Sequence, residues 1–415
     1  MLRMKGVLRL TQIDGTYGTA LVYTREVEQS AYTQIAQLMN QPFVEGARVR
    51  IMPEVHAGMG CVIGTTMHIV DKVCPNLVGV DVGCGVLVAQ LPIQRDAFDA
   101  PAFDRIVRRI PAGFSVNREP LHLEETEALL SQLVCLPHIK NLDRIYKSLG
   151  TLGGGNHFLE VAANAAGKLY LLIHSGSRNL GKQVAEHYQA LAANYHNQVP
   201  GEMLSELEAR FPGSKNAKRR QRELRRLKKQ HTRVPDDLAY LEGALLSDYL
   251  HDMRIAQRFA YRNREVMAQR ILEGLTPPVA LADTRPFQTV HNYIDQENIL
   301  RKGAVSARAG EVLVIPLNMR DGSLIVRGRG NPDWNHSAPH GAGRIMSRGE
   351  ARRVIDIKDF ERSMAGVYTT TLDQSTIDEA PMAYKPMADI LAAIGDTAEV
   401  LEHIRPIYNF KSAGD

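Results

Sequence analysis

The segment VGVDVGCGV places a carboxylate, Asp81, three residues before a thiol, Cys84. Glycines between and beside these two residues allow the backbone to turn tightly, so that both side chains can face one point. A thiolate together with a carboxylate suits a borderline divalent cation such as Mn²⁺, Fe²⁺ or Zn²⁺. Taken alone, the pair is equally compatible with a buried structural cysteine beside a capping aspartate.

Three histidines in similar surroundings favour the metal interpretation. His157 follows a glycine run in GTLGGGNHFLEV, His174 ends the apolar segment LYLLIHS, and His291 stands in TVHNYID. A single histidine in such a place is more often a core residue. Imidazole is, however, the commonest transition-metal ligand, and each of the three lies beside Gly, Asn or Ser. We therefore expect the three histidines to join Asp81 and Cys84 in one metal site.

The densest functional pattern is RGRGNPDWNHSAPHGAGRIMSRGEARR, residues 327–353. Its glycines free backbone N–H groups to approach an anion, and Arg344 and Arg348 offer guanidinium groups to phosphates. His336 and His340 are the candidate nucleophiles, because an imidazole can attack phosphorus and form a covalent phosphoramidate. The residues alone do not choose between the two histidines, and a glycine-rich surface loop remains the alternative.

A strongly basic run occupies residues 215–233, with ten Lys or Arg against the single acid Glu223. Such runs are usually solvated helix faces. Here there is almost no acid for the cations to pair with, which favours contact with a phosphate backbone. The run has no interleaved aromatic residues, so base stacking is not expected there.

The elements that must position these residues come in blocks. Short apolar runs with Gly and Pro predict strands and tight turns over 1–100, and LYLLIHS predicts a buried strand over 169–175. The remaining ranges read as helical over 122–148, as long helices over 182–275, as strands and Gly-rich turns over 280–345, and as mixed helix and loop over 348–402. Blocks of this kind favour an α+β domain with a helical insertion over a doubly wound sheet.

The composition is that of an ordinary globular protein, with 44% apolar and 23% charged residues among 415. A net charge of +4 is too small to establish a nucleic-acid partner. The N-terminus has no secretory signal, and no run approaches the ~20 apolar residues that span a bilayer. The four cysteines are irregularly spaced, so we expect reduced thiols, a cytoplasmic location and no membrane association.

Seven motifs, taken in order, resemble the RNA-splicing ligase RtcB family from about Arg48 to Lys411. They are MPEVHAGMG, VGVDVGCG, GTLGGGNHFLEV, HSGSR, HN at 291–292, RKGA and HGAGRIMSR. The resemblance implies one large α+β domain over 1–415, with mixed or antiparallel sheets flanked by helices. Within it, 182–275 is expected to be a helical insertion that includes the basic segment 213–235.

The activity implied by the resemblance is GTP- and Mn²⁺-dependent ligation of an RNA 3′-phosphate or 2′,3′-cyclic phosphate to a 5′-hydroxyl, in RNA repair or tRNA splicing. The residue that matches the family's nucleophile is His340, which would attack the α-phosphate of GTP and carry GMP before it passes to the RNA 3′ end. Two Mn²⁺ ions, bridged by the cysteine, would be held by Asp81, Cys84, His157, His174 and His291.

The resemblance also carries over nucleotide and RNA contacts. Those to the nucleotide are Asn156, Glu160, Asn318, Ser323, His340, Gly341, Ala342, Gly343, Tyr384 and Lys411. Arg178 and Arg344 would contact RNA phosphates. The expected partner is RNA carrying those ends, with an archease-type activator as a further candidate, and the protein is expected to be a monomer.

Two stretches depart from the family's pattern beside these contacts. PLNMRDG stands where a PGSMG-like turn is usual, so Leu317 and Arg320 replace glycines, and NHSAP at 335–339 replaces a Ser-Cys run. The five metal ligands and His340 are intact. Two alternatives therefore stay open at this point: an enzyme that caps nucleic-acid ends with GMP and seals poorly, or a non-catalytic RNA-binding protein.

Overall fold

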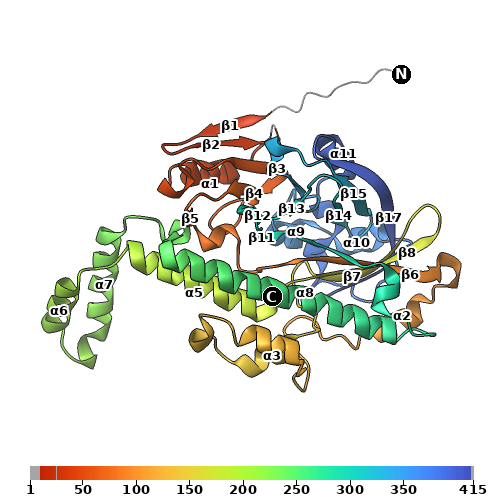
Figure 1. The fold of residues 1–415 in the computed structure, drawn as a ribbon, viewed down its shortest axis with the longest axis horizontal. Coiled ribbons are helices and arrows are strands. Elements are labelled where there is room, and N and C mark those ends of the chain that lie inside the picture. The colour runs from red at the N-terminus through yellow and green to blue at the C-terminus, as the bar shows by residue number, and fades with distance from the viewer. Residues whose placement is uncertain (1–9, 25, 413–415) are drawn as a thin grey trace.

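Two β-sheets form the frame of the molecule in the computed structural model, which describes residues 10–24 and 26–412 (Figure 1). The prediction that the N-terminus is not a secretory signal concerns a stretch that lies mostly outside the described residues. The first sheet has the order β1 (Thr11–Asp14), β2 (Thr19–Val22), β3 (Val49–His56), β4 (Ile63–His68), β12 (Ile299–Lys302) and β11 (Asn292–Ile294). Its strands come from residues 11–68 and 292–302, so the sheet forms only when these distant segments meet.

The second sheet is larger and carries most of the polar cavity described below. Its order is β10 (Phe287–Val290), β6 (Gly85–Gln94), β8 (Lys168–Ser175), β7 (Phe158–Ala163), β17 (Ala398–Lys411), β15 (Gly322–Gly328) and β14 (Val312–Asn318). Two short pairs complete the strands: β13 (Ala304–Ser306) with β16 (Ser337–Pro339), and β5 (Lys72–Val73) with β9 (Leu241–Glu242). Among the described strands, only β2 and β3 pair in parallel.

Helices cover these sheets, and two long ones cross the middle of the molecule. These are α5 (Arg178–His196) and α8 (Gly243–Glu273), which lie side by side (Figure 1). The other helices are α1 (Gln29–Met39), α2 (Ala100–Val107), α3 (Glu124–Leu130), α4 (Leu142–Ser148), α6 (Gly201–Arg210), α7 (Ala217–His231), α9 (Arg348–Val354), α10 (Ile357–Ser363) and α11 (Met387–Ile394). No helix in the described ranges is long and apolar enough to cross a membrane.

Helix α8 joins the two main apolar cores. Its first half, through Phe259, packs in the cluster beneath the first sheet, whereas Met267 and Ile271 pack against the second sheet. Burial on this scale, at roughly 25 cal/mol per Å² of apolar surface, makes the helix part of the core rather than an appendage. Helices α6 and α7 stand away from the body (Figure 1).

The α+β class, the largely antiparallel sheets and the helical segment are confirmed. The strand predicted over 169–175 is β8, and the helical region over 122–148 contains α3 and α4. The limits of the insertion, 182–275, stay a prediction, and within that range α5 and α8 contribute to the core. The 348–402 region ends in a feature that was not predicted, because β17 begins at Ala398 and runs through the centre of the second sheet.

Candidate active site

Five side chains meet where strands of the second sheet end: Asp81, Cys84, His157, His174 and His291. Cys84 Sγ lies 3.4 Å from His157 Nε2 and 3.3 Å from His174 Nε2. His157 Nε2 lies 3.0 Å from Asp81 Oδ2, and His174 Nε2 lies 3.4 Å from His291 Nε2. The thiol thus stands between two imidazoles, and the donor atoms of Cys84, His157 and His174 all lie within 4.8 Å of one another.

Strand register explains why these residues meet. In the second sheet His174 on β8 is paired with Val86 of β6 on one side and with Phe158 of β7 on the other. Cys84 directly precedes β6, His157 directly precedes β7, and His291 follows β10, which is paired with β6. Residues distant in sequence are therefore carried to one edge by antiparallel pairing.

Backbone carbonyls orient two of the imidazoles. His157 Nδ1 lies 2.9 Å from the Leu152 carbonyl oxygen, and His174 Nδ1 lies 3.2 Å from the Asn156 carbonyl oxygen. A ring that donates its Nδ1–H to a carbonyl presents the lone pair of Nε2, which is the usual arrangement of a metal-bound histidine. The donor set and its orientation therefore fit a divalent metal centre.

Close packing requires glycine next to two of these ligands. Gly83, at φ +73°, lies between Asp81 and Cys84, and a Cβ there would stand 2.7 Å from a backbone atom of α8. A Cβ on Gly176 would stand 2.0 Å from Asp81 Oδ1. From α8, the buried Arg264 donates to the carbonyl oxygens of Gly83 and Ser175, which holds the two ligand-bearing segments together.

Burial sets the protonation of the cluster. Burial tends to raise the pKa of Asp81, but the interactions with His157, Cys84 and Arg178 together outweigh it and lower that pKa to about 2. Burial, with the Asp81 charge, raises the pKa of the Cys84 thiol well above its usual value. Burial also lowers the pKa of His174 and His291 well below theirs. The site therefore holds the neutral imidazoles of His174 and His291 beside one carboxylate, and a bound cation would favour the thiolate of Cys84.

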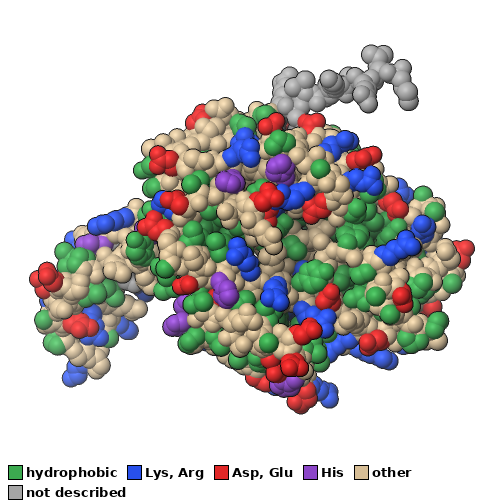
Figure 2. All heavy atoms as spheres, viewed as in Figure 1, with side chains coloured by type: hydrophobic (Ala, Val, Ile, Leu, Met, Phe, Trp, Pro, Cys, Tyr) green, Lys and Arg blue, Asp and Glu red, His purple; other side chains and the backbone are tan. Residues whose placement is uncertain are grey.

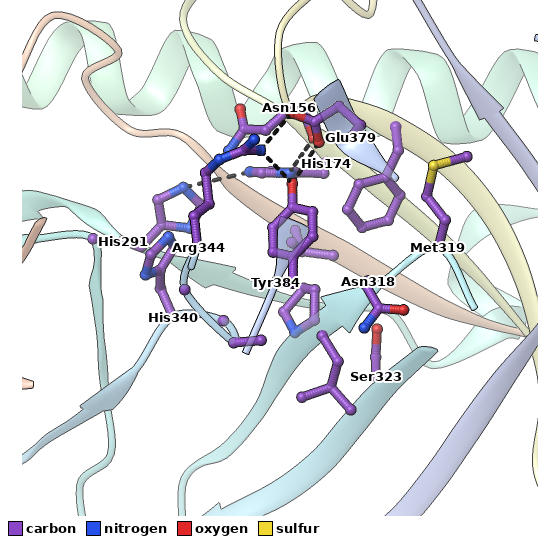
Figure 3. Close-up of a pocket in the computed structure, with 18 of the residues that line it drawn as sticks. Asn156, His174, His291, Asn318, Met319, Ser323, His340, Arg344, Glu379 and Tyr384 are labelled. Carbon is purple, nitrogen blue, oxygen red and sulfur yellow. Dashed lines mark hydrogen bonds and ion pairs between the residues drawn. The ribbon is translucent and has the colours of Figure 1, made fainter. Parts of the chain in front are cut away.

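A cavity of about 300 Å³ opens beside the cluster. Four of the five metal-ligand candidates line it, and so do all ten residues expected to contact the nucleotide: Asn156, Glu160, Asn318, Ser323, His340, Gly341, Ala342, Gly343, Tyr384 and Lys411. Figure 3 shows His340 and His291 next to each other on one side, with Ser323 and Asn318 farther along the cavity. The fifth ligand candidate, His157, faces a second cavity.

His340 stands at the boundary between the cluster and the cavity. Its ring centroid lies 5.0 Å from that of His291. A wholly buried carboxylate, Glu54, lies 3.3 Å from His340 Nδ1 and also accepts the backbone N–H of His340 at 3.1 Å. Nδ1–H donation to Glu54 leaves the Nε2 lone pair available, and Nε2 makes no hydrogen bond to the described residues.

His336, the other candidate nucleophile, lies outside both cavities. Its Nδ1 lies 3.0 Å from the carbonyl oxygen of Gly330, and its backbone φ is +50°. The ring therefore takes part in the loop that shapes the short β13–β16 pair. The geometry favours His340 over His336 as the residue that can reach a ligand.

One buried acid, Glu379, gathers the basic side chains of the cavity. Its Oε2 lies 2.6 Å from Lys411 Nζ and accepts the Tyr384 hydroxyl at 2.6 Å. Its Oε1 lies 2.8 Å from Arg348 and 3.4 Å from Arg344 (Figure 3). Burial tends to raise the pKa of Glu379, but Lys411 and Arg348 outweigh it and hold that pKa at about 2.

A second buried carboxylate, Glu160, is only half satisfied. One oxygen accepts from Asn409 at 2.8 Å, while Oε1 has no hydrogen-bond partner, and Asn409 Oδ1 has none either. Burial raises the pKa of Glu160 to about 8. Both residues line the cavity, so two acceptor atoms are aimed at a ligand that brings donors of its own.

The second cavity, of about 390 Å³, lies on the other side of the cluster. It shares Asp81 and Asn156 with the first and adds the basic residues Arg144, Arg178 and Lys182. The Arg178 guanidinium donates to the carbonyl oxygen of Gly113 at 2.9 Å. Of the two arginines expected to contact RNA phosphates, Arg178 therefore lies in the second cavity and Arg344 in the first.

The departure at 317–320 splits between the core and the surface. Leu317 is buried, and Asn318 lines the cavity while its amide donates to Asp321 at 2.8 Å. Arg320 points outward and pairs with Asp321 at 2.8 Å. The turn is therefore closed by its own polar side chains, and the substituted arginine does not enter the cavity.

Sequence reasoning missed the residues that hold the site in shape: Glu54, Glu379, Asn409 and Arg264. Glu54 lies inside the quoted motif MPEVHAGMG, and Glu379 lies five residues before Tyr384, so their nearness in sequence to site residues was the available signal. Arg264 lies within α8 with no motif around it.

Comparison with known proteins agrees with the resemblance. The family model described as tRNA-splicing ligase RtcB matches residues 34–136 and 136–412. RNA-splicing ligase RtcB of Escherichia coli K12 is 32% identical over 416 aligned residues, which cover 92% of this chain and 94% of that protein. RNA-splicing ligase RtcB2 of a second E. coli strain is 27% identical, with 94% and 93% covered. tRNA-splicing ligase RtcB of Aeropyrum pernix is 27% identical, with 86% of each covered. The chain belongs to the RtcB family.

Proposed function

We propose that this protein is an RNA ligase that joins an RNA 3′-phosphate or 2′,3′-cyclic phosphate to a 5′-hydroxyl, using GTP and two Mn²⁺ ions. The observation that carries the proposal is the position of His340, an imidazole held by Glu54 beside a Cys–His–Asp cluster in the wall of one cavity. The names of the relatives, RNA-splicing and tRNA-splicing ligases, support the same activity.

His340 is the nucleophile in this proposal. Glu54 holds the Nδ1 proton, so Nε2 attacks the α-phosphorus of GTP, an Nε2–P bond forms and pyrophosphate leaves. The guanylyl group then passes from His340 to an oxygen of the RNA 3′-phosphate. The RNA 5′-hydroxyl attacks that phosphate, the new phosphodiester forms and GMP leaves.

The Mn²⁺ ions would be held by Asp81, Cys84, His157, His174 and His291. Bound there, they supply positive charge to the phosphoryl oxygens next to His340. The cavity has the features a guanine nucleotide needs. The unpartnered oxygen of Glu160 suits the N–H donors of guanine, while Lys411 and Tyr384 lie beside it. The backbone N–H groups of 341–343 suit phosphate oxygens.

The RNA ends would enter on the two basic sides of the cluster. Arg344 and Arg348 line the nucleotide cavity, and Arg178 and Lys182 line the second cavity. Guanidinium groups recognise phosphate through paired hydrogen bonds. We also propose that the protein is cytoplasmic, which is consistent with its four free cysteines. It is further proposed to act as a monomer. An archease-type activator remains part of the same proposal.

The test uses GTP labelled at the α-phosphate with Mn²⁺, followed by RNA carrying a 3′-phosphate and a 5′-hydroxyl. We expect label on the protein, transfer of the label to RNA, and then a sealed product with release of GMP. Labelled RNA that accumulates without sealing would replace the proposal with end capping. Absence of label on both protein and RNA, with the five ligands metal-loaded, would contradict any guanylyl-transfer activity.

A further inference from the structure

The α6–α7 hairpin, residues 201–231, projects from the body beyond the far end of α5 (Figure 1). Its base is fixed, because the Asn197 side chain at the end of α5 donates to the carbonyl oxygen of Val234 at 2.8 Å and accepts from the N–H of Arg233 at 2.8 Å. None of its residues lines the two cavities of the site.

Helix α7 has two distinct faces. Arg220, Glu223, Leu224, Leu227 and His231 are partly buried and follow helical spacing along the face turned to the hairpin. The exposed face contains glutamines at 221 and 230 and six cations: Lys218, Arg219, Arg222, Arg225, Arg226 and Lys229. Figure 2 shows Lys and Arg side chains on this lobe. Among the described residues, the exposed face carries no acidic side chain, and its one apolar side chain is the small Ala217 at the start of the helix.

Four of these cations form a continuous row, Lys218, Arg222, Arg225 and Lys229, which we call the outer row. Successive members are three or four residues apart, so like charges are neighbours and repel one another. The one acid in the helix, Glu223, pairs with Arg226 at 3.9 Å and leaves the outer row unneutralised. At about 1.5 Å per residue the row is ~16 Å long. A duplex carries one negative charge per about 1.7 Å of axis, so a bound duplex would offset this repulsion.

The chemistry of the face selects the kind of partner. Protein interfaces are anchored by large apolar and aromatic side chains, and the exposed face of α7 has none among its described residues. Without aromatic residues it also offers no platform for unstacked bases. What remains is a row of charges that suits the phosphate backbone of a nucleic acid, independent of its sequence.

The length of α5 gives the distance between the hairpin and the proposed metal cluster. This helix begins at Arg178, four residues after His174, and has 19 residues. It therefore extends about 28 Å from the metal cluster towards the hairpin. At roughly 2.8 Å per base pair in an A-form RNA helix, this corresponds to about 10 base pairs of duplex.

We propose that the outer row of α7 binds the phosphate backbone of the RNA substrate about 10 base pairs from the ends being joined. The inference rests on the proposed ligase function and adds a requirement on the substrate. RNAs with a stem that reaches the hairpin are bound and sealed better than RNAs that end before it.

The test replaces all four members of the outer row with Gln, a residue of good helix propensity. The matched control replaces four exposed cations at other places on the body with Gln: Arg95, Arg105, Arg109 and Lys168. Both variants lose the same net charge. For an RNA stem of about 20 base pairs, we expect the slope of log Kd against log salt to fall by about 3 in the outer-row variant only.

The same comparison separates this inference from the ligase proposal. Guanylylation with GTP alone and sealing of RNA with stems under about 6 base pairs should be unchanged in the outer-row variant. An unchanged salt slope, or an equal loss in the control variant, would overturn the inference even if sealing persists. Replacing Lys218 and Lys229 with Arg keeps the positive charges and should keep the wild-type slope of log Kd against log salt. A smaller slope in this Arg variant would also count against the inference. Failure of the wild-type protein to seal either RNA would instead contradict the proposed function.

Discussion

The central cavity holds its charged side chains in buried pairs, whereas the α6–α7 hairpin leaves its cations in solvent. Glu379 alone gathers Lys411, Arg348 and Arg344 within 3.4 Å. Among the described side chains of α7, one solvent-accessible pair at 3.9 Å joins the partly buried Glu223 to the exposed Arg226. Buried charges are costly to leave unpaired, while exposed ones lose little when a partner is removed. The same residue types therefore fix geometry in one region and provide long-range attraction in the other.

The largest expected effect comes from the thiol at the centre of the cluster. Cys84→Ser removes the atom that lies between His157 and His174, and we expect guanylylation to fall by about 100-fold or more. Metal content measured by mass spectrometry should fall in parallel. The control is Cys135→Ser, also buried but remote from both cavities, which should keep its metal. Full metal content in Cys84→Ser would exclude the thiol as a ligand.

Glu379→Gln tests the buried pairs directly. Removing the charge leaves Lys411 and two arginines without their shared partner, and we expect a loss of roughly 3 kcal/mol in the free energy of unfolding. The pKa of Glu379 is held at about 2, below its ordinary 4.5. Its contribution is therefore complete above pH 4.5 and is lost as pH falls towards 2. Urea unfolding of both proteins at pH 6 and pH 3 should show a smaller difference at pH 3; an equal difference would argue against ion pairing.

Glu160→Gln tests the opposite pH dependence. Burial raises the pKa of Glu160 to about 8, so its neutral form stabilises the fold at low pH and this contribution is lost as pH rises through 8. We expect the free energy of unfolding of the variant, relative to that of the wild type, to rise by on the order of 1 kcal/mol between pH 5 and pH 8.5. Thermal unfolding across this range measures the trend, and a flat difference would refute it. Preference for GTP over ATP should decrease in the same variant.

The smallest effect is expected in the hairpin. Glu223→Gln removes the exposed pair with Arg226, and the free energy of unfolding should change by less than about 0.5 kcal/mol. Chemical denaturation beside Glu379→Gln gives the comparison under one set of conditions. A loss similar to that of Glu379→Gln would remove the distinction between the two regions.

Local motifs predicted the site residues that lie at the ends of strands. Glycine-rich turns around Cys84 and His157 are readable because only glycine allows the φ and the close packing observed at Gly83. The strand over 169–175 and the block order of elements followed from composition and spacing. These features depend on neighbours in sequence, and for that reason the sequence could predict them.

The remainder depends on contacts between distant segments. Glu54 contacts His340 across 286 residues, and Glu379 contacts Lys411 across 32 residues that include α11 and β17. The burial of α8 between two cores, rather than on the surface of an insertion, follows from sheet pairing that no local pattern specifies. The residue types alone also left both His336 and His340 open as nucleophiles; the family resemblance selected His340, and the cavity, which His340 lines and His336 does not, favours the same residue.

The central claim is that His340 forms the bond to the guanylyl group. Wild-type protein, His340→Ala and His336→Ala are incubated with Mn²⁺ and GTP labelled at the α-phosphate, then separated under denaturing conditions. The account predicts label on the wild type and on His336→Ala, and none on His340→Ala. Label that persists on His340→Ala, or that disappears from a folded His336→Ala, would contradict it.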